Sequence, residues 1–465
     1  MINLNINKNA KEYQEIKKTW DVNLFPELEK SGSEWQIAWC SFMKNVLIIT
    51  YNFPPRPAVG GLRIYGLAKY LPQYGWNPII LTAILPGDPD PQFTVIQTPY
   101  NDVVAQWKKR LGLNPNQTLT EQFNVSTKSE RLSIVERIAL ISSEIIAYPD
   151  SKRGWYDHAV LAGDKILKTQ KIDAILSSSS PVTSHLIAKV LSEKYQIPWV
   201  ADLRDLWTQN HYYQYSFIRN FFERKLELVT LSSTDALVTV SQPWCKELAK
   251  LHKMKKIHAI HNGYNPDEIN PGHPLSKKFK ILYAGSLYRG YQDPEPLFIV
   301  LNELIANNQI NPELVSFDLF IINQEWLNED VEKYNLKDIV HVHKPIIRNK
   351  ILEKQRESQL LLILLWNNPN EKGVIPAKIF EYLAAKRPII SIGKYYSGEL
   401  KEILEITNAG VELTEKGEIK KEIMNAYNEF IQNGSVPYHG IPTEIEKFSQ
   451  IEMTRKFVEI LNNIS

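Results

Sequence analysis

The sequence predicts two doubly wound α/β domains, each built on a parallel sheet between layers of helices. Short apolar runs of strand length alternate with longer amphipathic runs through most of the chain, a pattern typical of strands joined by crossover helices. A polar, Pro-rich stretch at 265–280 interrupts the alternation, and a second series comes after it. The length of 465 residues also exceeds a single core and suits roughly two or three domains.

The first series contains six strand-like runs and four amphipathic runs. The strands are expected at 45–51, 78–82, 173–179, 198–203, 236–241 and 257–262, and the helices at 62–74, 131–147, 183–195 and 217–232. Segment 84–130 lacks clear periodicity and contains PGDPDP. We therefore expect an insertion of loops and short helices there.

The second series is the more regular one. Its strands are expected at 281–286, 315–322, 339–343, 360–366, 388–393 and 410–413. The chain ends in a pattern that predicts one amphipathic helix over 444–463.

These elements give a domain plan. It has a first domain at 43–264, a linker at 265–280, a second domain at 281–440 and a C-terminal helical segment at 441–465. Residues 1–42 are polar and differ in character from the domain that begins at Met43. They are either an N-terminal extension or the product of a misassigned start, with Met43 as the true first residue.

The composition limits the classes of protein. A hydrophobic content of 43% with 23% charged residues is that of a globular chain, and the formal net charge of +2 gives no global reason to expect nucleic acid. Two cysteines, Cys40 and Cys245, make neither a disulfide framework nor a metal cluster. No apolar run reaches the roughly 18 residues of a membrane-spanning helix. We expect a cytoplasmic protein, with a peripheral contact at the inner face of the membrane left open; WKKRLGL at 107–113 is a candidate for that contact or a solvated loop.

In the first domain, three stretches come after strands and carry candidate ligand groups. Gly60 and Gly61 open a helix after a Pro-rich loop, where backbone can approach a ligand or simply make a tight turn. His185 comes after the strand end SSSS and is either structural or catalytic. Arg204 and Asp205 come after the strand at 198–203 and would either pair with each other or bind a substrate hydroxyl.

In the second domain, ILYAGSLYRG ends a strand in Gly285 and Ser286 and continues to Arg289, which could hold a phosphate or lie free on a surface loop. The stretch GVIPAKIFEYLAAKRPII predicts a helix that starts at Pro376, with Lys378 in its first turn and Glu381 three residues later. A cation there opposes the helix dipole. A bound phosphate would neutralise it, with the carboxylate accepting from ribose hydroxyls; the alternative is a local Lys–Glu pair.

With these motifs in view, residues 43–465 resemble glycosyltransferases of the GT-B fold, specifically the family-4-like group. The resemblance rests on six motifs in family order: PPRPAVGGLR, SSSSPVTSHL, DLRDLW, HNGYNPDEI, ILYAGSLY and PAKIFEYLAAKRPII. It implies two Rossmann-like domains facing each other across a cleft, with a last helix that crosses back to the first domain. It also implies metal-independent transfer, generally with retention, from a nucleotide-sugar co-substrate and without another cofactor.

The resemblance also implies roles for individual residues. Arg289 and Lys378 would hold the diphosphate and stabilise the departing charge, with His185 as a further catalytic candidate. The donor side would comprise Gly285, Ser286, Gly373 and Glu381. The acceptor side would comprise Gly60, Gly61, Arg63, Arg204 and Asp205.

Two positions depart from the family pattern. The family keeps a glutamate eight residues before the one matched by Glu381; Gly373 stands there, with Glu371 nearby. Many members carry a His at the strand end that here reads Ser178 and Ser179. The expected activity is transfer of a hexose to a saccharide or lipid-linked acceptor in surface polysaccharide or glycolipid synthesis. The alternatives are a catalytically silent sugar- or nucleotide-binding protein and a nucleotide-sugar epimerase of the same fold.

Overall fold

The computed structural model describes residues 43–56, 58–110, 112, 114, 146–210, 216–269, 274–322, 325–368, 373–395 and 398–465. By their contacts these residues form two compact units. The first comprises the chain up to Val238 together with 251–258 and 457–465, and the second comprises 239–250 and 259–456. The predicted extension at 1–42, most of the predicted helix at 131–147, and Glu371 lie outside the described residues.

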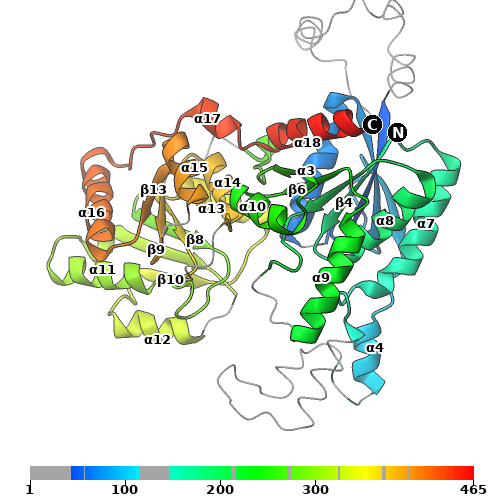
Figure 1. Cartoon of the computed structure of the whole chain (residues 1–465). Coiled ribbons are helices and arrows are strands. Elements are labelled where there is room, and N and C mark those ends of the chain that lie inside the picture. Colours follow the sequence, from blue (N-terminus) through cyan, green and yellow to red (C-terminus); the bar gives the residue numbers. More distant parts are fainter. Residues whose placement is uncertain are drawn as a thin grey trace, which may run out of the picture. The chain divides into compact units, whose positions relative to one another are not determined.

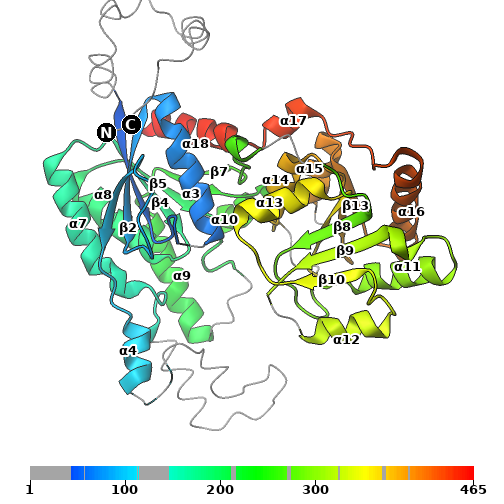
Figure 2. The same cartoon turned by 180° about the vertical axis from the view of Figure 1, so that it is seen from behind.

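The first sheet has seven described strands in the order β3-β2-β1-β4-β5-β6-β7 (Figures 1 and 2). They are β1 (Lys44–Thr50), β2 (Trp76–Ala83), β3 (Thr94–Thr98), β4 (Ala174–Ser179), β5 (Trp199–Leu203), β6 (Ala236–Thr239) and β7 (Lys256–Ala259). The central pairs are parallel, with Ile48 of β1 opposite Ile80 of β2 and Leu176 of β4. Their side chains are fully buried, as expected for a sheet that is covered on both faces.

The described helices of this half of the chain are α3 (Val59–Tyr70), α4 (Val103–Arg110), α7 (Tyr156–Thr169), α8 (Thr183–Tyr195), α9 (Phe217–Leu231) and α10 (Gln242–Leu251). Helix α8 matches its predicted bounds. Two of the elements that were not predicted are β3 and α7. Strand β3 lies inside the segment expected to hold only loops and short helices, where its half-exposed residues give no apolar run. Helix α7 buries only a narrow stripe formed by Ala159, Gly163 and Ile166.

The second sheet has six described strands in the order β10-β9-β8-β11-β12-β13. They are β8 (Phe279–Ala284), β9 (Val315–Phe320), β10 (Val340–His343), β11 (Leu360–Leu364), β12 (Ile389–Ile392) and β13 (Gly410–Leu413). Alternate residues enter two different cores: Ile281 and Leu362 lie in one, and Leu282 and Leu361 in the other. Because both faces are buried at the centre of the sheet, β11 reads as a continuous apolar run.

The helices of the second half are α11 (Glu295–Ala306), α12 (Glu325–Lys333), α13 (Arg348–Glu357), α14 (Lys378–Ala385), α15 (Glu399–Thr407), α16 (Lys416–Asn433), α17 (Pro442–Glu446) and α18 (Gln450–Ile464). Two predictions were wrong in detail. Helix α14 begins at Lys378 rather than at Pro376. The C-terminal segment forms two helices, α17 and α18, instead of one, with a break at residues 447–449.

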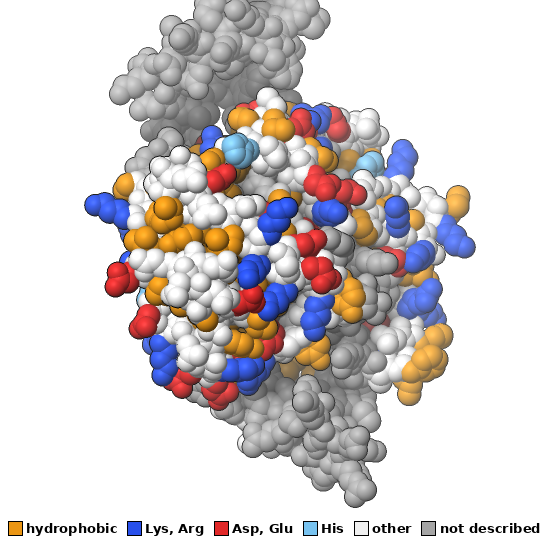
Figure 3. Space-filling model, turned by 90° about the vertical axis from the view of Figure 1, so that its left-hand side faces the viewer, with side chains coloured by type: hydrophobic (Ala, Val, Ile, Leu, Met, Phe, Trp, Pro, Cys, Tyr) orange, Lys and Arg blue, Asp and Glu red, His pale blue; other side chains and the backbone are white. Residues whose placement is uncertain are grey.

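Helix α18 starts in the second unit, and its last residues belong to the first. The indole Nε1 of Trp76 donates to Asn462 Oδ1 at 3.0 Å, and the Phe457 ring lies beneath the Arg63 guanidinium. The chain therefore returns to the first unit, as the fold prediction required. Figure 3 shows one face of the molecule, on which basic, acidic and hydrophobic side chains are interspersed over the described residues.

Candidate functional site

Arg204 and Gly60 lie against each other at the start of α3. A Cβ on Gly60 would come within 2.5 Å of Arg204 Nη1, so the glycine leaves the space that the guanidinium fills. Arg204 Nη2 donates to Asp205 Oδ2 at 2.6 Å, while its Nε is buried without a hydrogen-bond partner. Gly61 approaches the Asn52 carbonyl, to which a Cβ would lie at 3.3 Å. These residues lie in the segments that follow the carboxyl ends of β1 and β5 in the first sheet.

Arg63 is held in a buried ion pair. Its Nη2 and Nε donate to Asp202 Oδ1 and Oδ2 at 3.0 and 3.1 Å, and Ser178 Oγ donates to the same carboxylate at 2.9 Å. Arg63 is 3% exposed and Asp202 is 0% exposed. With its guanidinium engaged in this way, Arg63 has a clear structural role, and its predicted contact with an acceptor stays a prediction.

His185 is enclosed within the first unit. Its Nδ1 lies 2.7 Å from Ser177 Oγ, which also accepts from Trp199 Nε1 at 2.8 Å, and its Nε2 is buried without a partner. Burial lowers the pKa of the imidazole to about 4, a shift that the nearby Asp202 opposes. The side chain is 0% exposed. With this pKa the ring is neutral at pH 7. This geometry favours a packing role over the predicted catalytic one.

Lys378 is the clearest candidate ligand group in the second unit. It is the first residue of α14, and its ammonium lies 3.8 Å from the centroid of the Tyr283 ring. A Cβ on Gly285, whose φ is +147°, would lie 2.7 Å from Lys378 Nζ. The Tyr283 hydroxyl donates to the Ser286 carbonyl at 2.5 Å and so fixes the ring beneath the ammonium. The end of β8 and the start of α14 thus both lie beside the Lys378 ammonium.

Within the described residues, no carboxylate lies within ion-pairing distance of Lys378 Nζ. The side chain keeps part of its surface open to solvent. Even so, desolvation lowers the pKa of Lys378 to about 7, and the more distant Glu381 opposes that shift only in part. A lysine in this state becomes fully charged when an anion binds beside it. The predicted alternative of a direct Lys378–Glu381 pair is not what the structure contains.

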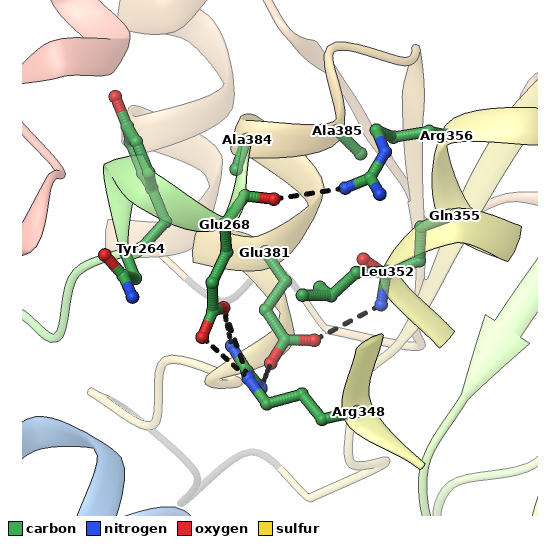
Figure 4. A pocket seen from close by; sticks show the side chains of 10 residues that line it. Tyr264, Glu268, Arg348, Leu352, Gln355, Arg356, Glu381, Ala384 and Ala385 are labelled. Atoms are coloured by element: carbon green, nitrogen blue, oxygen red, sulfur yellow. Dashed lines mark hydrogen bonds and ion pairs between the residues drawn. The ribbon is translucent and has the colours of Figure 1, made fainter. Parts of the chain in front are cut away.

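Glu381 points instead toward α13 (Figure 4). Its carboxylate accepts from Arg348 Nη1 and from Gln355 Nε2, the latter at 3.2 Å. Arg348 Nη2 also donates to Glu268 Oε2 at 2.8 Å, so the guanidinium lies between two carboxylates. These groups, with Tyr264, Asn265, Leu352, Arg356, Ala384 and Ala385, line a small open pocket. Sequence reasoning assigned no role to Arg348, because no motif surrounds it.

Arg289 and Gly373 have other surroundings. Arg289 Nη2 lies 3.2 Å from Asp330 Oδ1 on α12, and the side chain is 56% exposed. Gly373 has a φ of +94°, and a Cβ there would lie 2.7 Å from Trp244 Cδ1. No side chain fits that position, so the glutamate expected from the family pattern could not stand there without moving Trp244. The structure therefore brings Gly285, Ser286 and Lys378 together, with Glu381 one helical turn away, and pairs Arg289 with α12.

Metal-binding clusters and membrane-spanning helices are both absent from the described part of the chain. Its residues contain no cluster of three or more His, Cys, Asp or Glu side chains placed to hold a metal ion. None of its helices combines the length and apolarity needed to cross a membrane.

The arrangement of both sheets is shared with solved structures. HepE from Anabaena, solved in complex with UDP and glucose, has a TM-score of 0.56 at 12% identity, covering 90% of this chain and 100% of that chain. Sucrose-phosphate synthase from Thermosynechococcus elongatus has a TM-score of 0.53 at 13% identity, covering 90% and 94%. The N-terminal domain of Candida albicans trehalose-6-phosphate phosphatase has a TM-score of 0.56 at 10% identity, covering 90% and 96%. At these identities the likeness concerns the fold.

One family model matches part of the sequence. Residues 60–268 match the model of Glycosyltransferase Family 4. The chain has the GT-B fold, and its residues 60–268 are similar to Glycosyltransferase Family 4. The match supports glycosyltransferase activity in general terms. Within this GT-B chain, the match covers the surroundings of Gly60, His185 and Arg204, whereas Lys378 and Glu381 lie outside it. No curated protein matches the sequence.

Proposed function

We propose that this protein transfers a sugar, of hexose type, from a nucleotide-sugar donor to a saccharide or lipid-linked acceptor, with retention of anomeric configuration and without a metal or another cofactor. The observation that carries the proposal is the Lys378 ammonium, which lies beside Gly285 at the start of α14 with no carboxylate in ion-pairing distance among the described residues. A cation at the N-terminal end of a helix is suited to a diphosphate.

Lys378 would act on the leaving group. As the bond between the anomeric carbon and the diphosphate oxygen breaks, negative charge grows on the diphosphate, and a charged lysine stabilises it. The acceptor hydroxyl attacks on the same face, its oxygen bonds to the anomeric carbon, and its proton passes to the departing diphosphate. Ser286 and the glycine backbone at 285 would line the same side. Arg289 would join them only if it left Asp330.

Glu381 would bind the nucleoside end of the donor. Its carboxylate is aimed at the pocket beside α13 by Arg348 and Gln355. Ribose hydroxyls are donors that such a carboxylate accepts. The spacing of three residues between Lys378 and Glu381 places the two groups one helical turn apart, with the phosphate group at the helix terminus and the ribose beside the first turn.

The acceptor site is assigned to the first unit, around Gly60, Gly61, Arg204 and Asp205. The buried, unpartnered Nε of Arg204 is the group there that an acceptor oxygen could satisfy. We further propose that the enzyme works in the cytoplasm in surface polysaccharide or glycolipid synthesis, at the inner face of the membrane when its acceptor is lipid-linked. Sedimentation with lipid vesicles tests that location.

A thermal-shift screen tests the donor assignment. UDP, GDP and ADP and their common hexose conjugates are each added at millimolar concentration, since a bound ligand stabilises the folded state by mass action. We expect one nucleotide family to raise Tm and Lys378→Ala to abolish the increase without changing the Tm of the free protein by more than a few degrees. If no nucleotide raises Tm, the transferase proposal is wrong.

Product assays separate the remaining activities. Binding without transfer to any saccharide or lipid-linked acceptor would favour a silent member of the fold. Release of an epimerised sugar in the absence of acceptor would favour an epimerase.

A further inference from the structure

Three aromatic rings gather on two loops of the second unit. Tyr288 and Tyr291 lie on the loop after β8, and Trp366 lies on the loop after β11. The Trp366 ring centroid is 4.9 Å from that of Tyr288 and 5.9 Å from that of Tyr291, with tilted planes. Although they contact an indole, Tyr288 is 48% exposed and Tyr291 is 60% exposed. We call these three residues the aromatic platform.

The backbone beneath the platform is firmly anchored. Tyr288 and Gln292 form a two-residue bridge, in which each amide donates to the other residue's carbonyl, at 2.8 and 2.7 Å. The buried Gln292 side chain donates to the last carbonyl of β11, Leu364 O, at 2.6 Å, and Asn367 N donates to Tyr291 O at 2.6 Å. The two loops are therefore tied together, and the rings are held before any ligand arrives. Preorganised aromatic groups lose little conformational entropy on binding.

The platform adjoins the proposed diphosphate site. The Tyr283 hydroxyl donates to the carbonyl of Ser286, two residues before Tyr288, at 2.5 Å. Tyr283 is the ring on which the Lys378 ammonium lies. The loop that carries Tyr288 and Tyr291 also begins at Gly285, beside that ammonium. A ligand with its diphosphate at Lys378 thus has the platform within reach of the group attached to one of its ends.

Both tyrosine hydroxyls are available. Within the described part of the chain, neither the Tyr288 nor the Tyr291 hydroxyl has a hydrogen-bond partner. A platform of this kind therefore offers an apolar ring face together with two donors at its rim, which is a combination suited to a ligand that is itself apolar on one face and polar at its edge.

We propose that the aromatic platform binds the sugar ring of the nucleotide-sugar donor, with the C–H face of a pyranose against the rings and its hydroxyls at the tyrosine hydroxyls. The proposal rests on the proposed function, in which Glu381 binds the ribose of the nucleoside and so leaves the other end of the diphosphate for the sugar. An aromatic face carries partial negative charge and attracts the weakly positive C–H groups of a pyranose.

The experiment compares each donor with its own sugar-free nucleotide. Dissociation constants are measured by calorimetry for UDP-glucose and UDP and, in parallel, for GDP-mannose and GDP, with the full-length wild-type protein and Trp366→Ala. We expect Trp366→Ala to weaken binding of the nucleotide sugar about tenfold and to change binding of the matching diphosphate by less than twofold. Tyr291→Ala, a change at an exposed side chain, should act in the same direction. Trp366→Phe keeps a ring and should retain most of the discrimination.

The possible outcomes separate the two proposals. If the wild type binds neither these pairs nor ADP and its hexose conjugates, the proposed function is wrong and the platform proposal falls with it. If the wild type binds a pair but Trp366→Ala and Tyr291→Ala leave both constants unchanged, only the platform proposal is wrong. Equal weakening for sugar and diphosphate would also overturn it, since that result would place the nucleotide part on the rings or show a collapsed loop.

Discussion

The Lys378 ammonium lies on the face of the Tyr283 ring, 3.8 Å from its centroid. The ring gives the cation a favourable electrostatic contact that leaves its N–H groups free for another partner. A carboxylate in the same place would have neutralised the lysine. The contact with Tyr283 therefore positions the Lys378 ammonium and leaves it able to bind an anion. Desolvation lowers the pKa of Lys378 to about 7. This is a state in which the charge of the lysine responds to the arrival of an anion.

The first prediction concerns the pH dependence of nucleotide binding. In the free protein, Lys378 loses its proton as pH rises through about 7, whereas a bound diphosphate keeps it charged. Binding above pH 7 therefore takes up a proton, and affinity for the nucleoside diphosphate should fall about 25-fold between pH 6.5 and 8.5. Calorimetry in buffers of different ionisation enthalpy measures both the constant and the proton uptake.

Lys378→Arg is the matched control for this effect, because a guanidinium stays charged throughout the range. The variant should bind with little dependence on pH beyond that of the ligand's own phosphate. If the wild type and the arginine variant show the same pH profile, Lys378 is not the group that titrates.

The second prediction uses a pair of glycines in one loop. Gly285→Ala places a methyl group 2.7 Å from Lys378 Nζ, whereas Gly290 has open space around it. Both have positive φ, at +147° and +76°, so alanine strains the backbone at either position. Only Gly285→Ala displaces the ammonium, and it should weaken diphosphate binding at least tenfold, while Gly290→Ala should lower Tm with little change in affinity. Similar losses of affinity in both would argue for a general loop effect.

The alternation of apolar and amphipathic runs was enough to predict both parallel sheets, because strands that are buried on both faces read as near-continuous apolar runs. Strand β3 escaped prediction, since its half-exposed residues leave no apolar run, and helix α7, which buries only Ala159, Gly163 and Ile166, was also missed. The break at 447–449 between α17 and α18 escaped as well: it is tied to residue 264 by backbone hydrogen bonds, Tyr264 N to Phe448 O and Gln450 N to Tyr264 O. These hydrogen bonds join residues that are far apart in the sequence, so no local pattern predicts them.

The candidate site was predictable to a similar degree. A lysine placed against its own helix dipole drew attention to Lys378 and Glu381 from the sequence alone, and the strand end ILYAGS drew attention to Gly285. Arg348 could not be found in this way, because its role depends on α13 packing beside α14. A motif shows which residues cluster and not which way they face, so the structural partners of the buried Arg63 and His185 could not be predicted. Their roles toward a substrate stay predictions.

The third prediction concerns the ribose. If Glu381 accepts from ribose hydroxyls, the wild type should prefer a nucleoside diphosphate over its 2′-deoxy analogue by roughly tenfold, which corresponds to about one charged hydrogen bond. Glu381→Ala should remove that preference and weaken binding of the ribonucleotide. Competition binding with the two analogues measures it. An unchanged preference in the variant would place the ribose elsewhere.

Arg348 should act through Glu381, as a positioning residue. Arg348→Gln leaves the Glu381 carboxylate with Gln355 as its remaining partner, so the preference for ribose over deoxyribose should be reduced and not abolished. Arg348→Lys keeps a charge but loses the geometry that reaches both carboxylates, and it should restore only part of the preference. If Arg348→Gln binds both analogues as the wild type does, the contact with Glu381 does not aim the carboxylate.

The last prediction concerns acid stability and the role of His185. The imidazole is fully buried, and burial lowers its pKa to about 4 in the folded protein from 6.5. Between these values the unfolded chain binds the proton and the folded protein does not, so unfolding becomes easier as pH falls from 6.5 to 4. The expected loss is about 3 kcal/mol over that window. Urea unfolding of the wild type and His185→Gln at several pH values measures it, because glutamine can keep a hydrogen bond to Ser177 but does not titrate. The gap in stability between the two proteins should shrink as pH falls. A constant difference in stability would mean that the imidazole is already protonated or open to solvent in the folded state. His185 would then again be a candidate for contact with a substrate.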